Sequence, residues 1–414
     1  MTTSTRGPVI DLSLSDVCTL ENVDCTGMAD GEPLIWCAQS NTFTFASNCI
    51  PPFACGGTGV WSFDNSLSLP GGSGFVQIAA TYDDLTDKYA VGGYPNAGFA
   101  APFTHGAVLI YTHDGTNWNL QQTMFDGDTV VLGGGRLGES VDIAQDGTII
   151  MGDPAFLAWG AGRSVSIATV SAGVWTYEQQ FNPAGGAAND FSGFAVAISS
   201  DGNLAVSGSH SFAGGGSQRG RVNTWTRTAG VWTEDSSAIQ VGGAAPADGD
   251  RFGETISISP DGTKLAVASG DITNSFVEFF DRVAGAWVFN TRITDANVFQ
   301  RFGRRMDMTN DRCVLGRTFG SDGTDVYVNN AGTWSLEQNL PTATSQGVTI
   351  HQGPLNQIAV SLNGTIEIYD LVSGTWTLSD TLTQANSGTI EYGCSDLFVT
   401  DGSTNDINFW SAPQ

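Results

Sequence analysis

Four histidines and many aspartates are the side chains of this sequence that could do acid–base chemistry. His105 and His210 fall in loops that could converge in space. No Ser-His-Asp spacing and no H-E-x-x-H motif accompanies them. Many aspartates precede glycine, and a tight turn explains that pair without catalysis. A carboxylate pair for glycoside hydrolysis stays open as an alternative, because spacing in space is invisible in a sequence. We therefore expect no catalytic residue and no enzyme.

Aromatic side chains on glycine-rich loops form the first candidate binding site. Three long segments, 93–106, 153–162 and 209–220, carry them. Aromatic rings can stack on the faces of sugars or anchor a protein partner. The alternative is that the rings fold down and cap the domain, or pack against a neighbouring subunit. The candidate residues are Tyr94, Phe99, Phe103, His105, Phe156, Trp159, His210 and Phe212.

Arginines form the second candidate site. Five of the fourteen arginines lie between positions 301 and 317, in a chain whose net charge is −26. We single out Arg301, Arg304 and Arg305 for an acidic glycan or a subunit contact. Neighbours on a strand point in opposite directions, so one of the last two is expected to face inward. The alternative is that these arginines pair with Asp307, Asp311 and other nearby carboxylates.

A sequence repeat predicts the secondary-structure elements that position these side chains. Tryptophans follow Gly-X or closely similar turns at spacings of 57, 57, 57, 55, 47 and 42 residues. A period of about 40–57 residues is the size of a four-stranded propeller blade. The seven tryptophans are Trp61, Trp118, Trp175, Trp232, Trp287, Trp334 and Trp376.

Each unit contains four short runs that alternate with period two, which predicts four antiparallel strands. Asp-Gly pairs join the first two runs as tight hairpins. The first tryptophan, Trp61, is not preceded by the three runs that precede the others. The last unit, 389–410, has three runs and lacks the fourth. We therefore predict an all-β, seven-bladed propeller of four-stranded blades, in which a strand within 60–69 completes the last blade. Ring closure removes a free edge.

The units resemble the FG-GAP repeat of the integrin alpha-chain propeller. The resemblance rests on Phe252-Gly253, Phe302-Gly303 and Leu137-Gly138, and on the Asp-Gly hairpins that follow. It covers about 350 of the 414 residues. Blades of that family often hold calcium in a D-x-D-x-D-G loop, which is matched here only by fragments at 126–128 and 248–250. Calcium is thus an open alternative, and we expect no metal and no cofactor.

The first 58 residues differ from the rest. The stretches Leu14–Val17, Gly27–Trp36 and Asn41–Phe45 resemble a module of fibre and spike proteins of bacteriophages and large algal viruses. Such a short segment cannot bury a core alone, so it needs a partner. One or two disulfides and reduced buried thiols are both open, and the absence of C-x-x-C argues against zinc. Its cysteines are Cys18, Cys25, Cys37, Cys49 and Cys55.

The resulting prediction is a non-enzymatic virion surface protein: a spike, fibre head or capsid appendage. Residues 1–58 would attach it to other virion proteins, and the propeller of 59–414 would bind a host glycan or protein. We expect a homo-oligomer on the virion surface. The high acidity argues against nucleic acid, and no apolar run is long enough to insert in a membrane. An extracellular adhesin or lectin is the alternative, and a propeller glycosidase or lyase a further one.

Overall fold

The structure is a computed structural model of the 414-residue chain. It describes residues 136–411 apart from the short segments 155–163, 188–189, 215, 236–237, 271–274, 296–300, 319–322, 352–355, 385–386, 394–395 and 402–405. Before residue 136 it describes seven strands and Gly106.

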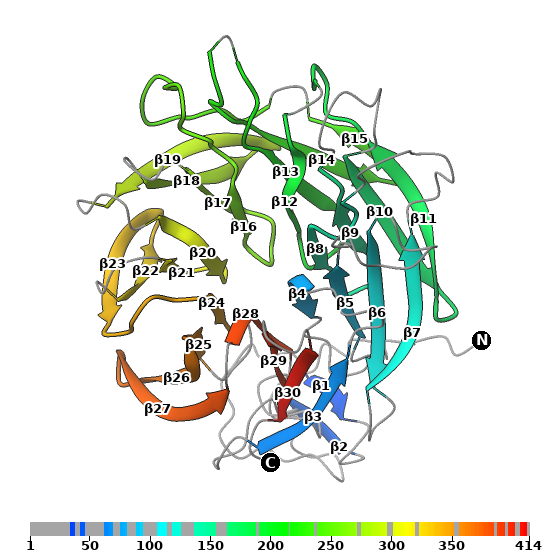
Figure 1. The fold of residues 1–414 in the computed structure, drawn as a ribbon, viewed down its shortest axis with the longest axis vertical. Helices are drawn as coiled ribbons and strands as arrows, with labels where there is room; N and C mark the ends of the chain where they lie inside the picture. The colour runs from blue at the N-terminus through cyan, green and yellow to red at the C-terminus, as the bar shows by residue number, and fades with distance from the viewer. Residues whose placement is uncertain are drawn as a thin grey trace. The chain divides into compact units, whose positions relative to one another are not determined.

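The described strands form seven four-stranded antiparallel sheets and one two-stranded sheet (Figure 1). The first sheet contains β4 (Phe75–Ala80), β5 (Lys88–Gly93), β6 (Ala107–His113) and β7 (Trp118–Phe125). The second contains β8 (Ser140–Ile143), β9 (Ile149–Gly152), β10 (Val165–Ser171) and β11 (Val174–Phe181). The third contains β12 (Ser192–Ile198), β13 (Leu204–Ser209), β14 (Val222–Thr228) and β15 (Val231–Glu234). The fourth contains β16 (Thr255–Ile258), β17 (Lys264–Ala268), β18 (Phe276–Val283) and β19 (Ala286–Thr294).

The later sheets repeat the same order. The fifth contains β20 (Phe302–Met308), β21 (Arg312–Arg317), β22 (Thr324–Asn330) and β23 (Thr333–Leu340). The sixth contains β24 (Gly347–Ile350), β25 (Gln357–Ser361), β26 (Gly364–Val372) and β27 (Thr375–Gln384). The last contains β28 (Ser387–Tyr392), β29 (Asp396–Asp401), β30 (Asp406–Ser411) and, out of chain order, β3 (Ser62–Ser68).

The first strands of the sheets form the inside of a ring. In order, β4, β8, β12, β16, β20, β24 and β28 each contact the next, and β28 contacts β4 again. Figure 1 shows these strands around a common centre, with the fourth strands at the rim. The predicted all-β propeller of four-stranded antiparallel blades is confirmed.

The closing strand lies where the split repeat predicts it. β3 pairs with β30 in an antiparallel ladder that runs from Ser62 opposite Ser411 to Ser68 opposite Asp406. A strand from the start of the propeller sequence and three strands from its end therefore share one sheet. The hydrogen bonds of this ladder cover an edge of β30 that would otherwise be open to another chain.

Two glycines of the repeat explain how neighbouring sheets approach. Gly208, at the end of the L-A-V-S-G run, lies so close to the next sheet that an added Cβ would sit 2.0 Å from the carbonyl oxygen of Gly253. The same contact joins Gly152 to Gly193, at 1.9 Å. Gly253 has a φ of +89°, which favours glycine. The glycine of the F-G pair is thus needed both for the turn and for the close packing of neighbouring sheets.

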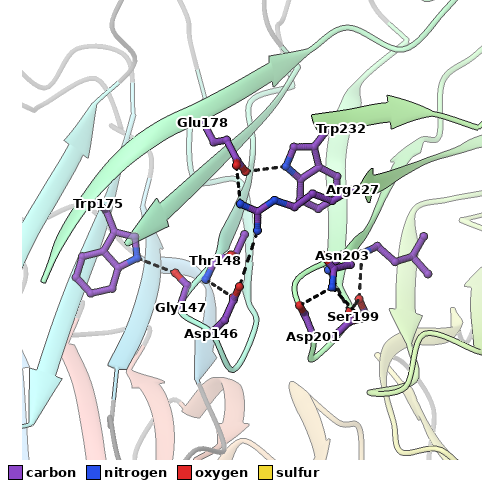
Figure 2. A network of polar contacts seen from close by, with 11 residues as sticks. Asp146, Gly147, Thr148, Trp175, Glu178, Ser199, Asp201, Asn203, Arg227 and Trp232 are labelled. Atoms are coloured by element: carbon purple, nitrogen blue, oxygen red, sulfur yellow. Dashed lines mark hydrogen bonds and ion pairs between the residues drawn. The ribbon is translucent and has the colours of Figure 1, made fainter. Parts of the chain in front are cut away.

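Hairpin turns and a polar network link the sheets near the Asp-Gly turns. The indole Nε1 of Trp175 donates to the Gly147 carbonyl oxygen at 2.8 Å, within one sheet (Figure 2). Glu178 receives two hydrogen bonds from the next sheet, from Arg227 at 2.5 Å and from the indole of Trp232 at 2.8 Å. The recurring tryptophan therefore combines a buried ring with a polar tip that finds a partner.

Residues Met1–Gly57 form a separate contact unit from Thr58–Gln414. In the first unit the structure describes one hairpin, in which β1 (Leu34–Cys37) pairs with β2 (Thr42–Phe45). The attachment role predicted for this unit, and its cysteine chemistry, lie outside the described residues. In the second unit, Cys313 is a buried free thiol, and burial raises its pKa.

Candidate functional site

A cavity of about 340 Å³ lies among the innermost strands. Residues of β8, β12, β16, β20, β24 and β28 line it, so it occupies the channel of the ring. Most of the lining side chains are valine, isoleucine, alanine, serine and threonine. The charged lining residues are Glu139, Asp142, Glu254, Arg304, Arg305, Asp307 and Glu391.

A recurring position of the repeat brings arginines to the beginnings of the inner strands. The sequence reads R-L-G-E at 136–139, R-F-G-E at 251–254 and R-F-G-R at 301–304. Arg251 and Arg301 have φ values of +51° and +50°, a conformation that costs energy for a residue with a side chain. The third sheet has Phe191 at this position, also with positive φ. The backbone of the repeat therefore holds this position in one unusual conformation.

The carboxylates near these arginines are already engaged. Glu139 pairs with Arg136 at 2.8 Å. Glu254 pairs with Arg251 at 3.4 Å and also with Arg304, which reaches it from the next sheet. In the fifth sheet an arginine stands where the other two repeats have glutamate. This exchange leaves more arginines than glutamates around these positions.

Arg305 is the exception among the arginines of its sheet. No described residue holds its side chain by a hydrogen bond or ion pair, and its Nε is a buried donor without a partner. Burial, together with the positive charge of Arg304, lowers the pKa of Arg305 to about 10. It is therefore still charged at neutral pH.

A β-bulge explains how two consecutive arginines both line the channel. Phe302 lies opposite Arg317, but Arg305 lies opposite Gly316, so two extra residues of β20 fit into one step of β21. Strict alternation would send Arg304 and Arg305 to opposite faces. The bulge breaks that alternation, and both residues border the cavity.

His210 lies beside the arginines at the end of β13. It is buried, stacked on Phe191 with ring centroids 5.2 Å apart, and in edge contact with Phe194 at 4.4 Å. Its pKa is lowered to about 3, first by burial and then by the positive charges of Arg251, Arg304 and Arg136. His210 is thus neutral at physiological pH. It is a packed side chain, and part of its pKa shift comes from the nearby arginines.

Two channel aspartates connect neighbouring sheets. Asp142 Oδ2 accepts the backbone N–H of Ile198 at 2.8 Å. Asp307 Oδ2 accepts the N–H of Ile350 at 2.8 Å and the hydroxyl of Thr349 at 2.9 Å. Burial raises the pKa of Asp142 to about 7 and that of Asp307 to about 6, although the hydrogen bonds act in the opposite direction. Both carboxyl groups face the enclosed channel, which explains why their pKa values rise although the two residues are partly exposed.

The predicted aromatic site is only partly described. Phe212 packs under the guanidinium of Arg221, whose Cζ lies 4.1 Å from the ring centroid. His210 is buried as described above. The burial of His210 fits the capping alternative, whereas Phe212 is half-buried and its role stays a prediction. The remaining members lie outside the described residues and stay a prediction: Tyr94, Phe99, Phe103, His105, Phe156 and Trp159.

The arginines between 301 and 317 divide into two groups. Arg312 pairs with Glu337 and Asp311, at 3.0 and 2.9 Å. Arg317 lies between Asp295 and Asp325, at 2.9 Å from each. These two arginines, and Arg304 through Glu254, fit the structural alternative of pairing with nearby carboxylates, whereas Arg305 does not. An alignment of the residue before each F-G pair would have found the recurring arginine.

Among the described residues, no cluster of three or more histidine, cysteine or acidic side chains could hold a metal ion. Within the same part of the chain, no helix is long and apolar enough to cross a membrane. The calcium fragment at 126–128 lies outside the described residues.

No protein-family model matches the chain, and no curated protein matches it in sequence. A solved chain from a structure described as "Crystal Structure of Mitotic Checkpoint Complex" is similar in fold, with a TM-score of 0.58 and 14% sequence identity. The match covers 85% of this chain and 95% of the other. At this identity the likeness concerns the propeller fold alone. Neither the FG-GAP family nor a viral fibre module gains support from these comparisons.

Proposed function

We propose that this protein is a non-enzymatic attachment protein of a virion surface, in which a ring of seven sheets binds a host glycan or protein. The observation that carries the proposal is the organisation into two units. A short N-terminal unit with a fibre-like sequence pattern precedes a closed propeller, and the contacts divide after Gly57. A rigid ring offers a fixed scaffold, and the small unit is suited to assembly.

The state of four of the five channel carboxylates favours binding over hydrolysis. A glycosidase of the usual kind needs two carboxyl groups facing the scissile bond, one as acid and one as base or nucleophile. Here Glu139 and Glu254 are paired with arginines, and Asp142 and Asp307 accept backbone hydrogen bonds between sheets. None of these four is available for such a reaction without breaking a contact of the fold.

Assembly onto particles tests the proposal. The full chain and a variant of residues 58–414 are each produced in infected cells and sought in purified particles. We expect the full chain in particles and the shortened chain in solution, because attachment is assigned to residues 1–57. Equal incorporation of both would contradict that assignment. Absence of both from particles would favour the extracellular adhesin, the second candidate, which rests on the resemblance of the F-G repeats to integrin-type blades.

A further inference from the structure

We propose that the channel binds a small ligand carrying one carboxylate or sulfate group, with the guanidinium of Arg305 as its anchor. The ligand class that fits best is an acidic monosaccharide at the end of an otherwise neutral glycan. The assignment to a glycan deepens the proposed attachment function and rests on it. The anion site itself stands on the geometry of the channel.

The first argument is the unpaired charge. Arg304 and Arg317, on the same pair of strands, each contact at least one carboxylate. Arg305 contacts none of the described carboxylates, and its Nε has no acceptor. Leaving a half-buried charge without a partner is costly, and an anionic ligand would remove that cost. A guanidinium offers two parallel N–H donors, which match a carboxylate or sulfate.

The second argument is space beside Arg305. Gly347 and Val348 of β24 line the cavity together with Arg305. On β28, Thr389, Ile390 and Glu391 line the same cavity. The cavity of about 340 Å³ is close to the lower limit of ordinary small-molecule sites, and a single sugar ring is of that scale.

The third argument is charge at long range. The chain carries a net charge of −26, which repels a polyanion before it reaches the channel. A ligand with one acidic group on a neutral body avoids most of that repulsion, because surface charges are screened beyond about 8 Å at physiological salt. Near the beginnings of the inner strands it meets the positive charges of Arg251 and Arg304, which add to burial in lowering the pKa of His210. Charge therefore favours a single terminal anion over a sulfated polymer.

Other charged groups border the same space. Asp307 lies two residues along β20, Asp142 and Glu391 line the cavity from β8 and β28, and Arg304 is held by Glu254. The competing interpretation is that Arg305 offsets these acids without touching them. That role would make Arg305 a stabilising residue in the absence of any ligand. The two interpretations predict opposite effects when its charge is removed.

Calorimetric titration of the full-length protein with D-glucuronate, and with D-glucose as the neutral match, tests the site. We expect glucuronate to bind and glucose to bind at least about tenfold more weakly, a factor worth about 1.4 kcal/mol. Arg305→Gln should reduce glucuronate affinity about tenfold or more. Arg219→Gln, which removes an arginine from an exposed pair with Asp248, is the matched control and should bind as the wild type does.

Melting temperatures without ligand separate a binding role from a structural one. We expect Arg305→Gln to melt at or above the wild-type temperature, because an unpaired buried charge is lost. A lower melting temperature would overturn the proposal in favour of a structural arginine. So would unchanged glucuronate affinity in Arg305→Gln, or the absence of glucuronate binding to the wild type.

Two further probes identify the ligand class. Acetate that binds as tightly as glucuronate would show that the site recognises a carboxylate alone, and would contradict the assignment to an acidic sugar in favour of a protein carboxylate. Heparin that binds more tightly than glucuronate would contradict the single-anion argument. Because all these probes are used on purified protein, a failure here is distinct from a failure of particle attachment.

Discussion

The carboxyl group of Asp307 accepts the backbone N–H of Ile350, 2.8 Å away on the first strand of the next sheet. Asp142 of the second sheet makes the corresponding contact with Ile198 of the third sheet. A side chain of one inner strand thus completes the hydrogen bonding of the next. Thr349 continues the pattern, because its hydroxyl accepts the N–H of Tyr392 at 3.3 Å.

These contacts predict a pH dependence of stability. Aspartate in an unfolded chain has a pKa of about 3.9, whereas burial raises the pKa of Asp142 to about 7 and that of Asp307 to about 6. The folded state therefore binds these protons more tightly. Their contribution to stability is full below about pH 4, declines as the pH rises through about 6 and 7, and is constant above that range.

Urea unfolding between pH 4 and pH 8 measures this effect. The double variant Asp142→Asn, Asp307→Asn should lose several kcal/mol of the wild-type pH dependence, because each unit of pKa difference is worth about 1.4 kcal/mol and neither amide titrates. Asp248→Asn is the control, because that carboxyl is exposed and its pKa is lowered by hydrogen bonds from Arg219 and Ser217. Identical pH profiles for the wild type and the double variant would contradict the assignment.

Glu278 is expected to be a major stabilising residue of the fourth sheet. Its carboxylate is fully buried and accepts the backbone N–H groups of Gly242 and Gly243, both at 2.7 Å. Arg292 donates two more hydrogen bonds, at 2.8 and 2.6 Å. Glu278→Ala should lower the free energy of unfolding by about 3 kcal/mol or more, because it leaves a cation and two amides without partners.

Chemical denaturation measures the Glu278→Ala loss directly. The comparison variant is Asp311→Ala, which removes an exposed partner of Arg312 and should cost less than about 1 kcal/mol. Similar losses in both variants would show that burial of the first carboxylate matters less than its four contacts indicate.

Phe212 should behave as a structural residue. Its ring lies under Arg221, which is buried and also donates to the Ala184 carbonyl oxygen at 2.9 Å. Phe212→Ala should lower stability by on the order of 1–2 kcal/mol, the range of a desolvated cation–π contact. Thermal unfolding measures the loss, and host binding should be unchanged when equal concentrations of folded protein are compared. A specific binding defect in the Phe212 variant would return that residue to the ligand site.

Trp159→Ala, by contrast, is expected to weaken host binding several-fold and to leave the melting temperature unchanged.

The closing ladder predicts that residues 59–69 are essential to a soluble ring. Deleting them removes β3 and exposes the edge of β30. We expect the deletion to aggregate, because an open edge pairs with other chains. Light scattering checks this, with deletion of residues 1–50 as the control that keeps β3 and should stay soluble. A monodisperse protein after the first deletion would mean that the ladder is dispensable.

The strands were predictable because each has a local cause: alternation, an Asp-Gly hairpin and a recurring tryptophan. The closing strand was predictable because an incomplete unit at each end implies one shared sheet. The arginine environment was not, since the bulge between Phe302 and Arg305 changes side-chain directions that alternation alone would fix. Nor does the sequence indicate that Arg304 takes Glu254 from the preceding sheet while Arg305 finds no partner.

The ladder between β3 and β30 also sets the order of events during synthesis. β3 leaves the ribosome early, but its partner is translated last among the described strands. Until then the nascent chain carries β3 unpaired and six sheets that can form from consecutive strands, so it is exposed to aggregation for most of translation. A stalled or prematurely terminated product that lacks Asp406–Ser411 would leave the ring open, and quality control of this protein therefore depends on its final strand.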